Sequence, residues 1–507
     1  MFGNWLKYLN KTIHITLFLL LNATHFAVNA QDTQPSPSAP PALSPATEKE
    51  LSSADTNREA EKKTAPPRPG FKPLRYEEDW SVLKDEANRT DYADSLKYIS
   101  LGRENFYLSI GGTARFYYEN YRNENFGSVP TDKNGWLLQR YMVHADWHFG
   151  KRVRVFSELK SGIINNRLGG ARPPDKDLLD VHQLFVDYKF TLGKQKSPIV
   201  LRFGRQEFNF GSSRLLTFRE GPNVRQSFDA ARISAKIEKW TLDGFVSKPV
   251  ETSGGFFDDA AIGNQTLWGV YAVRPAPLLS KKGAIDVYYF GLDRKRARFN
   301  QGFGREIRHS VGTRIWNAQE KLDYNFELIY QFGTFGRGRI NAWTVASDTG
   351  YTLKNVRFNP RFGVKANITS GDRDPNNPDL QTFNALFPKG GYFGQIAAVG
   401  PYNHTDVHPS VNLRLTKKVE LVADYVWFWR TSIRDGVYGV PGNLLKPGNL
   451  SRRRFVGQQI NSELRVQLDK HTNLNFAFAR FFAGGFLRET PPAKDINYLA
   501  AWITYKF

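Results

Sequence analysis

Arginine is the residue type through which this chain is best equipped to bind a ligand. The segment 202–239 carries eight arginines and lysines against four acidic residues, and further basic clusters lie at 294–308 and 452–454. A guanidinium group stays charged and donates paired hydrogen bonds to a carboxylate. The predicted chemistry is therefore reversible binding of anions. The clusters at 294–298 and 452–454 also suit solvated loops or contacts with lipopolysaccharide phosphates.

Metal binding is only weakly indicated. His144 and His148 share one face of a predicted strand, but four residues separate them by about 13 Å, too far to ligate one ion. The segment from Asp372 begins like a calcium-binding loop, yet Asn377 stands where that loop requires glycine and Phe383 where it requires glutamate. A polar loop is the favoured interpretation. We expect neither a metal nor another cofactor.

Catalysis and nucleic-acid binding are also disfavoured. The chain has no Cys, which excludes a thiol nucleophile, thiolate metal sites and disulfides. Ser410 lies near His404 and His408 in the sequence, but neither a nucleophile elbow nor the spacing of a catalytic triad accompanies them. We expect no enzyme activity. We also expect no nucleic-acid partner, because the positive charge is spread over an exported chain without a known binding module.

The composition limits how these residues can be positioned. The chain has 507 residues, 40% of them hydrophobic, and a formal net charge of +21. A membrane-spanning helix needs about 20 consecutive apolar residues, and no stretch reaches that length. A bundle of membrane-spanning helices is therefore excluded, while the charge predicts attraction to anions.

The N-terminus predicts export. Lys7 and Lys11 precede an apolar run, and short residues at 28–30 suit cleavage, so 1–30 is interpreted as a signal peptide. Residues 31–73 contain nine prolines and few large apolar residues, which predicts a disordered periplasmic tether. Residues 74–104 regain apolar residues and are expected to form a short helix or an ordered lead-in.

Beyond the lead-in, apolar and polar residues alternate. In 421–429 the odd positions are apolar, and Asp424 and Arg430 belong to the other face. Such alternation predicts strands with one apolar face, and it recurs at 108–118, 322–332 and 460–468. A soluble β-sandwich also alternates. However, the aromatic strand ends and the spacing of the segments favour a transmembrane antiparallel β-barrel of about 18 strands over 105–507.

The end of the chain also indicates a barrel. Residues 499–507 alternate and finish on Phe507, with Tyr505 two positions earlier. This pattern resembles the C-terminal signal of bacterial outer-membrane barrels, which implies recognition by the barrel assembly machinery and a location in the outer membrane of a Gram-negative cell. Edge groups left unpaired in hydrocarbon are costly, so the strands must close, and about 16 to 18 strands leave a water-filled lumen.

A set of charged residues is the candidate lining of that lumen and of the substrate path. An arginine facing lipid at mid-membrane costs about 2 to 4 kcal/mol, so Arg205 and Arg430, in predicted strands, are expected to face the lumen. Arg202 and Arg205 have opposite parity, so one of them must lie near a strand end or a bend. The candidates are Arg115, His182, Arg202, Arg205, Glu207, Arg219, Arg225, Asp424, Arg430 and Arg465.

Distinctive sequence blocks carry a family resemblance. The most specific are Arg-Glu-Gly-Pro-Asn at 219–223 and Leu-Phe-Pro at 386–388. Together with blocks at 110–115, 202–207, 256–259, 370–372, 392–394 and 428–438, they resemble the alginate export family of outer-membrane proteins over nearly the whole chain from residue 75. The resemblance implies an eighteen-stranded barrel and, from the type member, secretion of the anionic polyuronate alginate through an Arg-rich constriction.

Two positions depart from the pattern of the type exporter. Glu207 stands where the exporter has a pore arginine, and His182 aligns with another of its arginines. We therefore expect weaker polyuronate binding than the resemblance implies. We also expect that binding to strengthen below about pH 6.5, where His182 would become charged.

Three functions remain open. The first is export of an anionic polysaccharide, with periplasmic export components as partners. The second is passive diffusion of small anionic solutes, as through an anion-selective porin, and the third is a structural or adhesion role. The segment 370–406, rich in Gly, Pro and Asn, could form a lid or a constriction in either kind of transport.

Overall fold

The computed structural model describes residues 68–193, 197–277, 279–318 and 321–507. The predicted signal peptide and residues 31–67 of the predicted tether lie outside this part of the chain. Within the described residues, no helix has both the length and the apolar character needed to cross a membrane.

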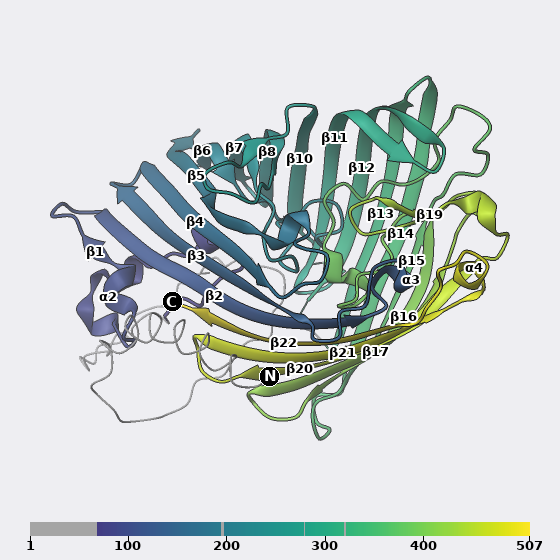
Figure 1. The fold of residues 1–507 in the computed structure, drawn as a ribbon. Coiled ribbons are helices and arrows are strands. Elements are labelled where there is room, and N and C mark those ends of the chain that lie inside the picture. Colours follow the sequence, from purple (N-terminus) through teal and green to yellow (C-terminus); the bar gives the residue numbers. More distant parts are fainter. Residues whose placement is uncertain (1–67, 194–196, 278, 319–320) are drawn as a thin grey trace. The chain divides into compact units, whose positions relative to one another are not determined.

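Eighteen long strands form one closed antiparallel barrel (Figure 1). The strands pair in chain order, and β22 (Ile496–Lys506), yellow in Figure 1, pairs with the blue β2 (Phe106–Arg122) to close the ring. The predicted fold class and strand number are confirmed. The other barrel strands are β3 (Trp136–Phe149), β4 (Val153–Asn165), β5 (Asp177–Leu192), β6 (Ser197–Gln206), β7 (Phe228–Ile237), β8 (Trp240–Glu251), β10 (Gln265–Pro275), β11 (Gly283–Phe299), β12 (Gly302–Asn317), β13 (Leu322–Phe335), β14 (Gly338–Thr352), β15 (Arg361–Thr369), β16 (His404–Arg414), β17 (Val419–Trp429), β20 (Phe455–Gln467) and β21 (Thr472–Ala483).

The two faces of each barrel strand differ in character. On β13, Phe326, Leu328 and Tyr330 are exposed on the outer face, whereas Ile329 and Gln331 are buried on the inner face. Apolar side chains on the outside can contact lipid, and polar side chains on the inside can contact water or one another. The parity of a residue within its strand therefore decides whether it can reach the lumen.

The long loops all join strands at one end of the barrel, where two connections are only two residues long, and the connections at the other end have at most eight residues. We call these two ends the turn end, with connections such as 150–152 and 468–471, and the loop end, with 207–227, 370–403 and 430–454. In outer-membrane barrels the short turns face the periplasm and the long loops face the exterior. The loops also hold α3 (Glu124–Gly127), η4 (Pro173–Asp175), β9 (Ala260–Ala261), η5 (Gly390–Phe393), β18 (Val437–Tyr438), β19 (Leu444–Lys446), η6 (Gly448–Leu450) and α4 (Gly485–Arg488).

The N-terminal segment, residues 68–104, packs against the barrel at the turn end. Arg75 donates from Nη1 to the carbonyl oxygen of Gly112 and from Nη2 to that of Phe507, both at 2.8 Å. Pro73, which falls in the predicted tether, accepts a hydrogen bond from Arg225 Nη2 at 3.0 Å. The segment contains η1 (Arg75–Glu77), η2 (Ser81–Lys84), η3 (Glu86–Asn88), α2 (Asp94–Lys97) and β1 (Ile99–Ser100).

Deleting Phe507 should reduce assembly of the barrel. Gly112 and Phe507 exchange two backbone hydrogen bonds, from Gly112 N to Phe507 O at 3.0 Å and from Phe507 N to Gly112 O at 3.1 Å. Their loss at the closing seam costs about 1 to 3 kcal/mol, and the Arg75 contact is lost with them. The measurement is the fraction of membrane-extracted protein that migrates as a folded barrel on an unheated gel. Phe362→Leu, which trims an exposed outer side chain, is the control and should assemble normally; equal folded fractions in all three proteins would contradict the prediction.

Candidate functional site

Two long loops fold back from the loop end into the lumen. We call 207–227 and 370–403 the constriction loops. Their backbones pair with each other: Phe387 N donates to Leu215 O at 2.8 Å, and Thr217 N donates to Phe387 O at 3.2 Å. The segment predicted as a lid or constriction is thus one half of a two-loop structure.

Side chains attach both constriction loops to the inner wall. Asn223 Nδ2 donates to the carbonyl oxygen of Gln139 on β3 at 3.0 Å. From β13, Gln331 Nε2 donates to the carbonyl oxygen of Asn384 at 2.7 Å. Because these buried amides hold the loops at several strands, the loops form part of the lining rather than free flaps.

Three arginines converge on Glu220 in loop 207–227. Arg140 forms an ion pair with its carboxylate, and Arg225 Nε lies 3.3 Å from Oε2. Arg115 Nη1 donates to the backbone oxygen of Glu220 at 3.1 Å. The surrounding protein acts to raise the pKa of Glu220, whose side chain is half exposed, but Arg140, Arg225 and Arg115 hold this pKa below its usual range. The structure thus brings together the predicted residues Arg115 and Arg225, adds Arg140, and neutralises part of their charge.

His182 and Glu207 form a buried pair instead of lining the path. His182 has no exposed surface, and its Nε2 lies 2.7 Å from Glu207 Oε1. Arg225 Nε lies 2.9 Å from the same oxygen. The expectation that His182 and Glu207 contact the solute is wrong, because protein encloses both. This geometry also removes the basis for stronger binding through His182 at low pH.

Arg202, a predicted pore-lining candidate, is on the inner side of β6, but neighbouring side chains surround its guanidinium group. Its Nε and Nη2 donate to the two oxygens of Asp187 at 2.7 and 2.8 Å. Its guanidinium carbon lies 3.8 Å from the ring centre of Phe185 and 4.2 Å from that of Tyr76. Tyr76 also donates from its hydroxyl to Glu207 O at 3.0 Å. The N-terminal segment therefore places the side chain of Tyr76 in the lumen, where the guanidinium group of Arg202 packs against its ring.

Arg205 points away from the lumen, so the prediction for this residue is wrong. It lies one residue before the end of β6, after Gly204, whose φ is +128°. Arg205 then pairs in register with Leu184, whose side chain is exposed on the outer face. Its Nε donates to Asp229 Oδ1 at 2.8 Å. The outward position is tolerated because the Asp229 carboxylate compensates the charge. Arg202 and Arg205 face opposite sides because they are three positions apart in a strand whose register is unbroken.

The prediction that Arg430 faces the lumen is also wrong. It directly follows the last residue of β17 and is only 1% exposed. Its guanidinium donates only to backbone carbonyl oxygens, those of Ile433, Asp435, Gly448, Ser451 and Arg453. Arg430 therefore organises loop 430–454 and cannot contact a solute.

Asp424 and Arg465 lie on the inner faces of β17 and β20, and both are paired. Asp424 Oδ1 is 2.9 Å from His408 Nε2. Arg465 Nε donates to Glu463 Oε1 at 2.8 Å, and its Nη1 lies 3.3 Å from Glu420 Oε2. Both residues are on the inner wall, and acidic neighbours compensate the charge of Arg465.

The cationic side chains at the lumen that have no ion-pair partner among the described residues include Arg219, Lys365, Lys389 and Lys506. Arg219 and Lys389 belong to the constriction loops. Lys365 lies on β15 next to the outward-facing Val364, and Lys506 lies on the inner face of β22. Arg219 also has a buried Nε without a hydrogen-bond partner. Only Arg219 was among the sequence candidates; strand parity could have identified Lys365 and Lys506, but no sequence signal separates paired cations from unpaired ones.

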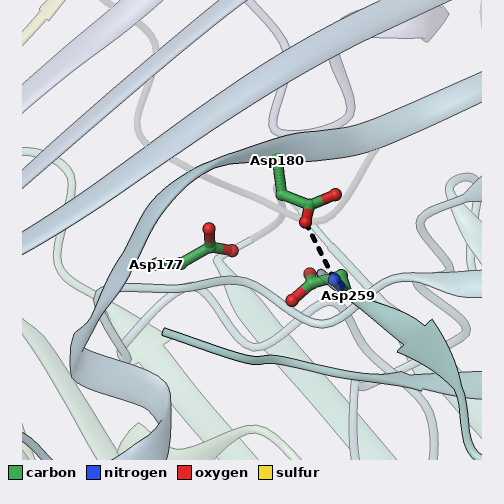
Figure 2. Close-up of side chains that lie close together, drawn as sticks. All are labelled: Asp177, Asp180 and Asp259. Atoms are coloured by element: carbon green, nitrogen blue, oxygen red, sulfur yellow. Dashed lines mark hydrogen bonds between the residues drawn. The ribbon is translucent and has the colours of Figure 1, made fainter. Parts of the chain in front are cut away.

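An acidic cluster attaches loop 252–264 to the wall. Asp177, Asp180 and Asp259 each bring one carboxylate oxygen within 4.8 Å of the others, and Asp259 N donates to Asp180 Oδ2 at 2.9 Å (Figure 2). Lys160 Nζ lies 2.8 Å from Asp177 Oδ2 and 2.6 Å from Asp259 Oδ2. This ammonium group supplies the positive charge that a metal ion would otherwise bring, so the cluster is a structural ion network.

The comparisons with known proteins cover nearly the whole barrel. The sequence profile of the alginate export family matches residues 106–500. The chain belongs to the alginate export family. No curated protein matches the sequence. Membership extends over the strands and over both constriction loops, so the site lies entirely within the family region.

Solved structures show where this alginate export family member stands among barrels. It is similar to a BenF-like porin from Pseudomonas fluorescens Pf-5, with a TM-score of 0.52, 12% identity, and coverage of 79% of this chain and 98% of the porin. OccK8 (OprE) of Pseudomonas aeruginosa gives a TM-score of 0.51 with the same identity and coverages. OccK2 (OpdF) of P. aeruginosa, solved in complex with glucuronate, gives 0.50, again at 12% identity, 79% and 98%. At these identities the likeness shows the fold, and fold and family together make the protein an outer-membrane channel.

Removing Arg75 should widen the channel at the turn end. Arg75→Ala deletes two hydrogen bonds to the closing seam and the ion pair of Arg75 Nε with Glu78 at 2.6 Å. Such buried charge-assisted bonds contribute about 1.5 to 3 kcal/mol each, enough to release the segment and Tyr76 for much of the time. Single channels in a planar bilayer should then show a larger mean conductance. Lys84→Ala removes one charge from an exposed ion pair in the same segment and should not; an unchanged conductance for Arg75→Ala would place the segment outside the conducting path.

Proposed function

We propose that the protein conducts an anionic polysaccharide across the outer membrane through the lumen that the constriction loops narrow. The observation that carries the proposal is the set of unpaired cations Arg219, Lys365, Lys389 and Lys506, in a lumen where the neighbouring arginines are compensated by carboxylates. Uncompensated fixed charge raises the local concentration of counter-ions in a narrow pore. The net preference of the lumen is therefore for anions.

The placement of these cations suits a polymer. Lys506 ends β22 near the turn end, Lys365 lies within β15, and Arg219 and Lys389 lie on the constriction loops. A polyanion that passes from the turn end to the loop end would meet positive charge at successive depths. Each contact is a single exchangeable ion pair, which attracts the chain without trapping it. A polyuronate, with one carboxylate per sugar, is the chemical class that fits best.

Diffusion of small anionic solutes is the alternative, and one observation favours it. The N-terminal segment inserts Tyr76 into the lumen, and both constriction loops fold inward, so a narrow route suits a small solute as well as an extended chain. The glucuronate complex of OccK2 indicates only that a barrel of this fold can hold a uronate. Because the same charges serve both functions, selectivity and polymer block must be measured separately.

Removing the unpaired charges should reduce anion preference and polyuronate block together. The variant is Arg219→Gln/Lys365→Gln/Lys389→Gln, measured by reversal potential in a salt gradient and by transient block with polyuronate oligomers. Each lost ion pair is worth about 0.6 kcal/mol, so the blocking concentration should rise roughly threefold per charge. Lys417→Gln removes an exposed charge in a turn between β16 and β17 and is the control.

The results of this experiment distinguish transport of a polymer from diffusion of small anions. Loss of selectivity and of block in the triple variant supports polymer transport. Loss of selectivity alone, with no block in any protein, indicates passage of small anions. A triple variant that keeps the anion preference of the wild type would end both versions of the proposal.

Raising the pH should weaken the anion preference of the channel, and this change should occur at a lower pH than the deprotonation of an ordinary lysine. Lys389 is exposed to the lumen, but the surrounding protein limits its hydration and lowers its pKa, and the positive charges of Lys365 and Arg465 lower it further. Since the charged form is the protonated one, the preference should fall as the pH rises through this lowered pKa. Reversal potentials recorded across the alkaline range should show this step in the wild type and not in Lys389→Gln; a step of equal size in the variant would assign it to another group.

A further inference from the structure

A cavity of about 320 Å³ opens at the loop end, beside β14 and loop 430–454. Its wall includes Trp343, Arg373 and Arg434, together with Arg454. A second cavity of about 110 Å³ shares Trp343 and Arg373 with it. Both cavities include residues of constriction loop 370–403, among them Ser370, Gly371 and Arg373, but none of loop 207–227.

The strand register places this cavity on the outer wall. Trp343 pairs with Tyr330, whose side chain is exposed on the outer face. On the other side of the cavity, the hydroxyl of Thr431 lies 2.8 Å from that of Thr405, which pairs with Trp429 on the outer face of β17. Directly paired residues share one face of a sheet, so the cavity faces away from the lumen.

Three arginines line the cavity, and the guanidinium groups of two of them are anchored by backbone oxygens. Arg454 Nη1 donates to Thr431 O at 2.7 Å, and Arg434 Nη1 donates to Arg373 O at 3.1 Å. In the described part of the chain, Arg373 and Arg454 form no ion pair, and Arg434 has only Asp374 at 3.9 Å. A guanidinium offers five N–H donors, so most donors remain free for a ligand. The cavity is therefore a prepared site for an anion with several acceptor oxygens.

An apolar wall continues from the cavity toward the turn end. Val345 is the next outward residue after Trp343, and it pairs with Ile368; their side chains are 47% and 44% exposed. Tryptophan is enriched where hydrocarbon meets the polar region of a membrane. The order along the wall is thus aliphatic residues, an indole, and then arginines, which matches a lipid with acyl chains and an anionic head group.

We propose that this cavity binds the phosphate of a phosphorylated glycolipid in the outer leaflet, with the lipid chains lying along Val345 and Ile368. Arg373, Arg434 and Arg454 would donate to the phosphate oxygens, as guanidinium groups do in paired geometry. A free phosphate would use the same donors but would gain nothing from the apolar wall. The proposal rests on the outer-membrane location of the barrel and does not depend on which solute the lumen conducts.

The test measures binding of purified lipid A to the full chain in detergent. The site variant is Arg373→Gln/Arg454→Gln. The matched control is Arg337→Gln/Arg452→Gln, which removes the same charge from exposed loop-end positions outside the cavity lining. Folding of each protein is checked by migration on an unheated gel. Arg373→Lys/Arg454→Lys, which keeps the charge but not the paired donors, is the second site variant.

We expect diphosphoryl lipid A to bind the site variant at least about fivefold more weakly than the wild type, because two charge-assisted contacts are lost. The control should stay close to the wild type, and the lysine variant should fall between them. Lipid A without phosphate should bind the wild type as weakly as diphosphoryl lipid A binds the site variant. Equal losses in the site variant and the control would overturn the proposal in favour of general surface charge. Full displacement of lipid A by an equimolar concentration of inorganic phosphate would overturn it in favour of a free-anion site.

Discussion

Closure of the barrel is the constraint on which the other features of this protein depend. In hydrocarbon every backbone donor and acceptor must find a partner within the protein, and here the last open edge is removed where β2 pairs with β22. A ring of eighteen strands encloses a lumen too wide to be filled by the side chains of the wall alone. The chain therefore narrows it with folded segments, two constriction loops from one end and the N-terminal segment from the other. The seam also anchors that segment, because Arg75 binds the carbonyl oxygens of Gly112 and Phe507.

Compensation of charge decides what the lumen offers to a solute. Arginines are numerous inside the barrel, but a guanidinium enclosed by protein needs nearby acceptors. Asp187 provides them for Arg202, Glu327 for Arg214, and Glu220 for three arginines at once. The charge available to a solute is consequently that of the cationic side chains that have no carboxylate partner. Counting arginines in the sequence therefore overstates the field that a passing anion would experience.

The alternation of residues predicted the fold well, because the strand period and the need for closure act on every strand alike. Side-chain positions were predictable only where parity alone decides them, as for Arg115, Arg202 and Arg465. The prediction for Arg205 failed because Asp229 compensates an arginine on the outer face, so the cost of exposing an isolated charge to lipid does not apply. That for Arg430 failed because the strand ends one residue earlier and the loop folds around the side chain. The pairing of His182 with Glu207 joins a residue of β5 to the first residue of constriction loop 207–227, and such a contact cannot be derived from the spacing within one strand.

The ammonium of Lys160 among Asp177, Asp180 and Asp259 has a consequence for how the protein behaves in its membrane. The outer leaflet is held together largely by divalent cations that bridge lipid phosphates, and chelators loosen it by withdrawing them. Where a surface loop is fixed by bound calcium or magnesium, the same treatment would release the loop. Loop 252–264 is attached through a covalently tethered cation, so its position is independent of the ions that the surrounding lipids share.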